Sequence, residues 1–276
     1  MRFPLQTLRL NQNKMNKILE QIVIQKRKEI QVLKGLKTIN DFEKEIYFNR
    51  KNISLSQSLR QTEFGIIAEF KRKSPSAGEI DSNKSILDQT LLYQKSGVSA
   101  VSILTDETFF GGSVNDILQI RNSLSIPILR KEFIVDEIQI FEAKAVGADA
   151  ILLIAEVLTK KELLHFTILA KSLGLEVLAE FHSFKELEKL NDEVDVIGVN
   201  NRNLDTQTTN IENSYKLAEF LPQNKLLISE SGIKTTEEIQ KLISFGYKGA
   251  LIGESILKDK NPAELIKQFN SYSYVH

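Results

Sequence analysis

The sequence contains no cysteine at any of its 276 positions. A chain without thiols forms no disulfide, and it offers neither a thiol nucleophile nor a thiolate ligand for a metal ion. The absence fits a reducing compartment, and we expect the protein to be cytoplasmic. Small disulfide-stabilised folds and cysteine-dependent catalysis are therefore excluded.

The chain also has no excess of either charge, because 36 Lys and Arg residues balance 36 Asp and Glu residues. A basic surplus would have indicated nucleic acid or an anionic membrane as a partner, and we expect neither. No apolar run approaches the roughly 20 residues that a membrane span needs, and polar residues interrupt the first ten positions too often for a secretory signal. We expect a small-molecule substrate and a monomer or weak homodimer.

Histidine is scarce, and its positions do not indicate a metal site. The three histidines are His165, His182 and His276, and no two have the spacing of a ligand pair. The carboxylates do not form a calcium or magnesium loop either. We therefore predict no metal and no cofactor.

From residue 65 onward, short apolar runs alternate with amphipathic stretches. The runs are 65–70, 100–105, 127–133, 150–156, 176–181, 196–201, 226–231 and 249–255. Helix-like segments such as 160–174 and 235–246 separate them, and several end in Gly, as helix C-termini often do. Eight strand–helix repeats predict an α/β fold of the (β/α)8 TIM-barrel type. A doubly wound sheet is the competitor, but it usually has fewer strands and a glycine-rich phosphate loop, which this sequence lacks.

A helix is predicted before the repeats, over residues 14–34. Ile18, Ile22 and Ile30 contribute to its apolar stripe, and Gly35 ends it. Residues 36–64 look irregular or weakly helical. Because no Pro-, Gly- or Ser-rich linker divides the chain, we expect one structural domain overall. It would consist of an N-terminal extension (1–64), whose helix packs on the barrel, and the barrel itself (65–276).

Polar side chains recur near the carboxyl ends of five predicted strands, on the same side of each strand as apolar residues that should face the barrel interior. They are Glu69, Lys71, Lys131, Glu180, Asn200, Arg202 and Glu230. One such residue alone would usually lie at a solvated edge. A whole ring of them, at the end of a barrel where active sites lie, predicts a site that binds an anion and holds an acid near a base.

The loops after the last two strands predict a phosphate site. They carry Glu230-Ser231-Gly232 and Gly253-Glu254-Ser255. Barrels often bind phosphate with these two loops, and glycine lets backbone amides approach an anion closely.

Several segments together resemble one enzyme family. They are IIAEFKRKSPSAG, VSILTDETFFGGS, PILRKEFIVDEIQIFEAKAVGADAILLIAEVL, EVLAEFH, IGVNNRNL, ISESGI and LIGESIL. Over about residues 15–260 the chain resembles indole-3-glycerol phosphate synthase, a TIM-barrel enzyme of tryptophan biosynthesis with an extra N-terminal helix. The resemblance implies a carboxy-lyase that needs no cofactor. It would close the indole ring of 1-(o-carboxyphenylamino)-1-deoxyribulose 5-phosphate and release carbon dioxide and water.

The resemblance also implies catalytic roles. Lys131 looks like the general acid for the ketone oxygen, Lys71 like the cation that pairs with the substrate carboxylate, and Glu180 like the general base of dehydration. Glu69 and Asn200 look like groups that hold the sugar hydroxyls, and Glu230 like a residue that orients a lysine.

The remaining family-like positions are expected to bind the substrate. Arg202 resembles a further member of the polar ring. Ser74, Ser231, Gly232, Gly253 and Ser255 resemble the phosphate site. Phe110, Phe133, Leu152 and Ile154 resemble the apolar wall against the aromatic ring.

The lysines and the loop of the predicted site lead to further expectations. Burial beside Lys71 is expected to lower the pKa of Lys131. Glu132 stands where the family more commonly has Asp, and the pleat should point it away from the pocket. The loop after the first strand looks like a mobile lid, in which Lys73 and Ser74 help to hold phosphate.

Three other functions remain as alternatives. A Schiff-base aldolase would use Lys131 or Lys71 as an amine nucleophile. The isomerase of the preceding pathway step would normally need a cysteine, which this chain lacks. A barrel that only binds a phosphorylated ligand has no need for the full set of acids and bases.

Overall fold

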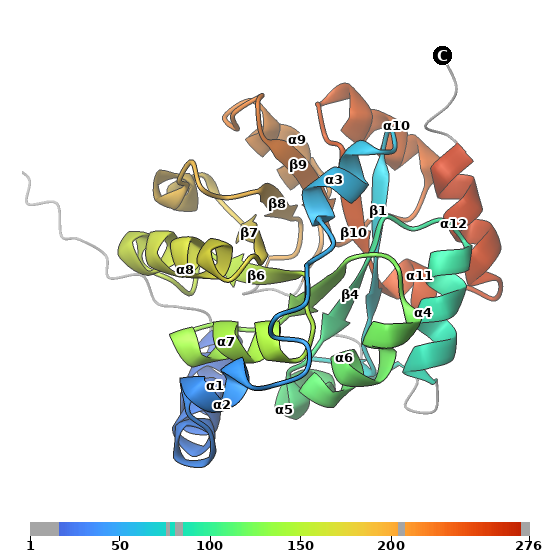
Figure 1. Ribbon diagram of the computed structural model, residues 1–276. Helices are drawn as coiled ribbons and strands as arrows, with labels where there is room; N and C mark the ends of the chain where they lie inside the picture. Colours follow the sequence, from blue (N-terminus) through green and yellow to red (C-terminus); the bar gives the residue numbers. More distant parts are fainter. Residues whose placement is uncertain (1–16, 76–77, 81–84, 204–207, 272–276) are drawn as a thin grey trace, which may run out of the picture.

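The computed structural model describes residues 17–75, 78–80, 85–203 and 208–271, and its centre is a closed barrel of parallel strands (Figure 1). The predicted helix start at residue 14 lies outside these ranges. The barrel strands are β1 (Gly65–Phe70), β4 (Ala100–Leu104), β5 (Ile128–Lys131), β6 (Ala150–Ile154), β7 (Glu176–Phe181), β8 (Val196–Asn200), β9 (Leu226–Glu230) and β10 (Gly249–Ile252). They pair in this order and β10 closes on β1, which confirms the predicted TIM barrel.

Helices surround the ring of strands (Figure 1). They are α1 (Lys17–Leu36), α2 (Ile39–Glu43), α3 (Leu55–Arg60), α4 (Ile86–Lys95), α5 (Glu107–Phe110), α6 (Val114–Ile120), α7 (Glu137–Ala145), α8 (Lys160–Ser172), α9 (Glu212–Ala218), α10 (Thr236–Ser244), α11 (Glu254–Lys258) and α12 (Pro262–Ser271), with 3-10 turns η1 (Arg121–Ser123) and η2 (Phe184–Lys189). A small hairpin of β2 (Lys73–Ser74) and β3 (Gly78–Glu79) follows β1. The predicted helices at 160–174 and 235–246 correspond to α8 and α10. No helix within the described ranges is both long and apolar enough to cross a bilayer.

Capping residues fix where the outer helices begin. At the start of α8 the Thr159 hydroxyl accepts a hydrogen bond from the Glu162 amide, and the Glu162 carboxylate accepts one from the Thr159 amide at 2.8 Å. Thr235 and Glu238 form the same reciprocal pair at α10. Such caps satisfy amides that the first turn of a helix leaves without partners. They explain why the chain turns into a helix so soon after each strand.

The strands are buried on both faces, as their sequences predict. Residues such as Ile66, Ala68 and Phe70 face the outer helices, whereas the alternate residue Ile67 faces the barrel interior. The interior cluster combines residues of all eight barrel strands with two leucines of α3: Ile67, Ala100, Leu129, Ala150, Leu152, Ile154, Leu178, Val196, Leu226, Ile228, Leu251, Leu55 and Leu59. Helix α3 therefore closes the amino-terminal end of the barrel.

The segment before β1 is held to this closed end by buried ion pairs. Asp149, at the start of β6, accepts hydrogen bonds from Arg50 and from Arg121, the latter at 2.6 Å. Glu176, at the start of β7, accepts from the hydroxyl of Ser54 and from the amide of Ser56. These contacts place α3 under the strands.

Helix α1 packs on the outside of the barrel. Its Ile30 is buried in a small cluster with Phe42 of α2 and with Ile138 and Phe141 of α7. The remaining face of α1 is more polar, as its amphipathic sequence predicts.

Candidate active site

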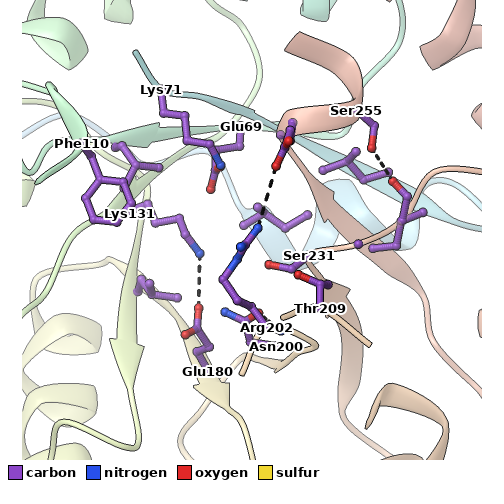
Figure 2. Close-up of a pocket in the computed structure, with 18 of the residues that line it drawn as sticks. Glu69, Lys71, Phe110, Lys131, Glu180, Asn200, Arg202, Thr209, Ser231 and Ser255 are labelled. Atoms are coloured by element: carbon purple, nitrogen blue, oxygen red, sulfur yellow. Dashed lines mark hydrogen bonds and ion pairs between the residues drawn. The ribbon is translucent and has the colours of Figure 1, made fainter. Parts of the chain in front are cut away.

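A cavity of about 680 Å³ opens at the carboxyl ends of the strands, where TIM barrels have their active sites (Figure 2). Six of the seven predicted polar residues line it: Glu69, Lys71, Lys131, Glu180, Asn200 and Arg202. The seventh, Glu230, lies beneath the lining and is 1% exposed. The ring that the period-2 pattern indicates is thus assembled.

Lys131 lies between two carboxylates at the base of the cavity. Its Nζ donates to Glu230 Oε2 at 2.9 Å and to Glu180 Oε2 at 3.2 Å, the second contact being drawn in Figure 2. The three residues end three different strands, so the barrel geometry itself brings them together. Glu230 thus contacts the lysine that the resemblance expects it to orient.

The pKa expected for Lys131 was wrong in direction. Burial lowers the pKa of Lys131, but the negative charges of Glu230, Glu180 and Glu69 outweigh burial and hold this pKa above its ordinary value. The expected cationic neighbour, Lys71, forms its ion pair with Glu69 instead of facing Lys131 alone. Lys131 is therefore fully protonated near neutral pH.

The two carboxylates beside Lys131 differ in their protonation. Burial opposes ionisation of Glu180, but Lys131, His182 and Asn200 hold its pKa well below the usual range. Burial raises the pKa of Glu230, and the neighbouring charge of Glu180 raises it further, against the pull of Lys131. Two buried carboxylates that share one cation do not both ionise easily. Within this pair the pKa of Glu180 is therefore lowered and that of Glu230 raised.

Glu69 and Lys71 form a second pair on the β1 side of the cavity. Glu69 is buried, and Lys71 together with Lys131 keeps its pKa low despite that burial. Gly253 makes room for this carboxylate, because a Cβ at Gly253 would lie 2.6 Å from Glu69 Oε1. The glycine predicted to bind phosphate therefore also accommodates an acidic neighbour.

Asn200 and Arg202 extend from the end of β8. The Asn200 side-chain oxygen accepts a hydrogen bond from the Arg202 amide at 3.0 Å. The Arg202 guanidinium lies 3.9 Å from the carboxylate of Glu254 (Figure 2). Asn213 of α9 donates to the carbonyls of Asn200 and His182, which ties together the ends of β8 and β7.

One wall of the cavity is apolar, as predicted. Phe110 of α5 and Phe133 lie with their ring centroids 6.0 Å apart and both face the cavity. Leu152 and Ile154 of β6 continue the wall. This surface suits a flat aromatic group.

The predicted phosphate loops meet at the opposite wall. Ser231, Gly232, Gly253 and Ser255 all line the cavity. Ser231 and Gly232 both have positive φ angles, 68° and 84°, so the backbone turns sharply there. The Ser255 hydroxyl donates to the carbonyl of Ile233 at 2.7 Å, which joins the two loops (Figure 2).

Ser74 and Lys73 are not among the residues that line the cavity. Both belong to the β2–β3 hairpin, and Lys73 Nζ donates to the carbonyl of Thr108 at 2.8 Å. Residues 76–77 of the predicted lid lie outside the described part of the chain. Phosphate binding by Ser74 stays a prediction.

Sequence reasoning missed several residues at the site. Thr209, Lys234 and Lys258 line the cavity near the two phosphate loops, and no motif singled them out. Lys26 was also missed; from α1 it reaches Asp106 and Glu132, each at 3.0 Å, and Glu29 at 2.7 Å. It lies in a run of charged residues that looks solvent-exposed in the sequence.

Glu132 is among the residues that line the cavity, contrary to the expectation that it points away from the pocket, although its carboxylate is bonded to neighbouring groups. It accepts hydrogen bonds from the Thr105 hydroxyl and the Phe133 amide, besides its ion pair with Lys26. Within the described ranges, no group of three or more His, Asp or Glu side chains is arranged to hold a metal ion.

Comparison with known proteins identifies the family. The family model described as indole-3-glycerol phosphate synthase matches residues 19–269. The chain belongs to the indole-3-glycerol phosphate synthase family. An indole-3-glycerol phosphate synthase of Bacteroides thetaiotaomicron is 44% identical over 255 residues, which is 92% of this chain and 98% of that protein. One from Petrotoga mobilis is 41% identical over 250 residues, 88% of this chain and 93% of that protein.

A more distant structural likeness concerns the fold alone. The crystal structure of tryptophan synthase subunit alpha from Legionella pneumophila superposes with a TM-score of 0.59 at 13% identity, covering 79% of this chain and 97% of that one.

The family membership predicted from the sequence motifs is confirmed by the family model and by relatives of nearly full length.

Proposed function

We propose that the protein is an indole-3-glycerol phosphate synthase, a carboxy-lyase of tryptophan biosynthesis. It converts 1-(o-carboxyphenylamino)-1-deoxyribulose 5-phosphate to indole-3-glycerol phosphate, carbon dioxide and water. The observation that carries this proposal is Lys131, held between Glu180 and Glu230 in a cavity with an apolar wall on one side and two glycine-containing loops on the other. The substrate has an aromatic ring, a carboxylate, a ketone and a phosphate, which match these surfaces.

Ring closure is assigned to positioning and to Lys131. The substrate is flexible, so holding its ring against Phe110 and its phosphate at Gly232 brings the aryl carbon to the ketone and removes much of the entropic barrier. Lys71 pairs with the substrate carboxylate in this pose. As the ketone oxygen gains negative charge, the ammonium of Lys131 stabilises it and transfers a proton. The raised pKa of Lys131 ensures that the proton is present at neutral pH.

Loss of carbon dioxide restores the aromatic ring, and dehydration then completes the indole. Glu180 is ionised because its pKa is held low, so it can accept a proton from the ring-closed intermediate. Glu69 and Asn200, which both line the cavity, are assigned to the sugar hydroxyls. Arg202, Ser231, Gly253 and Ser255 are assigned to the phosphate end.

The test compares wild type with Lys131→Ala in an assay of product fluorescence. The chain contains no tryptophan, so indole fluorescence reports the product without a tryptophan background from the protein. We expect wild-type turnover and a loss on the order of 10²-fold or more in the variant. Binding of a non-reactive substrate analogue should be largely retained. Exposed Lys95→Ala is the control and should behave as wild type. Equal loss of turnover and analogue binding would refute the acid role.

The Schiff-base alternative is disfavoured by the same geometry. An amine nucleophile must be neutral, and the carboxylates around Lys131 keep it protonated. Borohydride treatment in the presence of substrate should therefore trap no covalent adduct. An adduct at Lys131 or Lys71 would favour the aldolase.

We further propose that the protein works in the cytoplasm as a monomer or weak homodimer, with no cofactor and no nucleic-acid or membrane partner. The balanced charge of the chain supports the absence of a nucleic-acid or anionic-membrane partner. Residues 1–64 and the barrel are proposed to fold as one unit, because Arg50, Ser54 and Leu55 are anchored in the barrel. Light scattering of the whole chain, and the solubility of a chain starting at residue 65, test these two points.

A further inference from the structure

The proposed reaction consumes a proton, and this inference rests on that proposed function. The ketone oxygen leaves as water and so gains two protons. The substrate supplies only one, from the carbon or nitrogen that is deprotonated as the indole forms. The aryl carbon loses carbon dioxide in place of a proton. Each turnover with an ionised carboxylate therefore leaves the Lys131–Glu180 pair one proton short, and the proton must come from solvent.

Lys131 and Glu180 are only 15% and 4% exposed in the cavity, and in the proposed pose the substrate covers them. Glu180 is buried, yet it has a second contact that does not involve the cavity. Its Oε2 faces Lys131 at 3.2 Å, whereas its Oε1 lies 3.2 Å from Nε2 of His182. The carboxylate thus touches the acid on one side and an imidazole on the other.

His182 is placed between carboxylates. Its Nδ1 lies 3.7 Å from Glu156 in the loop after β6 and 4.0 Å from Glu186 of η2. The ring is 9% exposed, and neither ring nitrogen makes a well-aligned hydrogen bond to any residue that the structure describes. A purely structural histidine would normally have such a bond. This ring is instead flanked on both edges by groups that exchange protons.

Glu156 is the outer neighbour of this histidine. The Glu186 carboxylate already accepts hydrogen bonds from the amides of His182 and Ser183 and from the Ser183 hydroxyl, so it serves as the cap of η2. The side chain of Glu156 is 28% exposed and can exchange protons with water. A path of titratable groups thus runs from solvent through Glu156, His182 and Glu180 to Lys131.

We propose that His182 is a proton relay that recharges the Lys131–Glu180 pair once per turnover. A proton moves from the carboxyl group of Glu156 to Nδ1 of His182, while the proton on Nε2 moves to Oε1 of Glu180. Glu180 then passes its proton to the neutral amine of Lys131, and Glu156 takes a new one from water. Exchange of ring protons with water returns the imidazole to its Nε2–H tautomer before the next turnover. Histidine suits this task because each of its two ring nitrogens can accept or donate a proton.

The relay predicts a particular kinetic pattern in His182→Gln. With enzyme in excess, the first turnover uses the proton already on Lys131 and should proceed within about twofold of wild type. With substrate in excess, later turnovers should slow on the order of 10-fold, because the proton is replaced slowly. Added imidazole should restore the steady rate, and the solvent deuterium effect on that rate should increase. Product fluorescence measures both regimes.

The matched control is His165→Gln. His165 also contacts a carboxylate, Glu137 at 2.7 Å, but it lies exposed on α8 away from the cavity. It should match wild type in both regimes, with no response to imidazole. Glu156→Gln tests the outer end of the path independently and should lower only the steady rate, by a smaller factor.

Three outcomes would overturn the relay. Equal slowing of the first and later turnovers in His182→Gln would show that the ring only positions Glu180. An unchanged steady rate would show that Lys131 regains its proton from water entering the mouth after product release. A steady rate in Glu156→Gln equal to wild type would remove the outer step. Absence of product from wild type itself would instead refute the proposed synthase function.

Discussion

Gly198 leaves the space that the carboxylate of Glu230 occupies. A Cβ at Gly198 would lie 2.1 Å from Glu230 Oε1, much closer than any real contact. The two residues belong to adjacent strands, β8 and β9, whose register pairs Gly198 with Ile228. The missing side chain on β8 thus allows Glu230 to extend across the barrel floor and reach Lys131.

Gly198→Ala is therefore expected to displace Glu230 and misplace Lys131. Because displacements of about 1 Å can cost 10²-fold in rate, we expect kcat to fall about 100-fold. Steady-state kinetics measure this, and thermal unfolding reports any loss of stability. Gly35→Ala is the control, since no atom lies within 4 Å of its added Cβ. Normal kcat in Gly198→Ala would show that Glu230 does not orient the lysine.

Gly232→Ala should weaken binding of the phosphorylated substrate. Gly232 has a φ of +84°, and its added Cβ would lie 2.4 Å from Cγ2 of Thr209, within the cavity wall. We expect KM to rise about tenfold or more, which corresponds to about 1.4 kcal/mol. Gly246→Ala is a matched control, because its φ of +85° brings the same backbone strain but its nearest neighbour, Gln223, is 3.6 Å away. A similar KM for both variants would contradict the assignment of this loop to phosphate.

Glu230 should make the stability of the protein fall as pH rises. Burial raises the pKa of Glu230 to about 8, from an ordinary value of 4.5. Between these values the folded state holds a proton that the unfolded state has lost, so the free energy of unfolding falls by up to about 1.4 kcal/mol per pH unit. The lowered pKa of Glu180 acts only below pH 4.5, where stability falls as pH falls.

Glu230→Gln removes the carboxyl group whose pKa differs between the folded and unfolded states. Urea unfolding of both proteins at pH 5, 6, 7 and 8 should show a smaller decline for the variant. The difference between the two should shift steadily in favour of the variant as pH increases. Parallel curves for wild type and variant would show that Glu230 is ionised throughout.

Lys26→Met should destabilise the protein and lower its activity. Lys26 is buried, and its loss would remove the cation that pairs with the buried carboxylate of Asp106 and would leave Glu132 only the longer ion pair with Arg130, at 3.9 Å. Removal of one partner from such a group typically costs about 3–5 kcal/mol. Chemical unfolding measures this cost, and kcat should fall because Glu132 adjoins Lys131. Lys28→Met, at an exposed position two residues along α1, should change stability by no more than about 0.5 kcal/mol.

The strands and the polar ring could be predicted because both follow from local periodicity. Glu69 and Lys71 are two residues apart in sequence, and the pleat alone places them on one face. The strand boundaries agree to within three residues, the largest differences occurring where polar residues such as Glu132 and Glu254 follow the strand.

The electrostatics of Lys131 could not be predicted in this way. Its partners Glu180 and Glu230 lie 49 and 99 residues away in sequence, so the local sequence contains no trace of them. Lys26 was missed for a similar reason, since only the packing of α1 distinguishes it from the charged residues beside it. His182 was set aside because it lacks a metal-ligand partner, although its neighbours are carboxylates.

The two leucines of α3 determine by which end of the barrel substrate and product enter and leave. Leu55 and Leu59 are fully buried at the amino-terminal end of the barrel, below the layer of Leu129 and Leu178 that forms its interior. The active-site cavity is therefore closed at its lower end, and within the described residues no channel runs through the barrel from one end to the other. Substrate, carbon dioxide, water and product all pass through the one mouth of the cavity. The products must therefore leave before the next substrate binds. An enzyme that takes the product directly from this protein would have to bind at the mouth of the cavity.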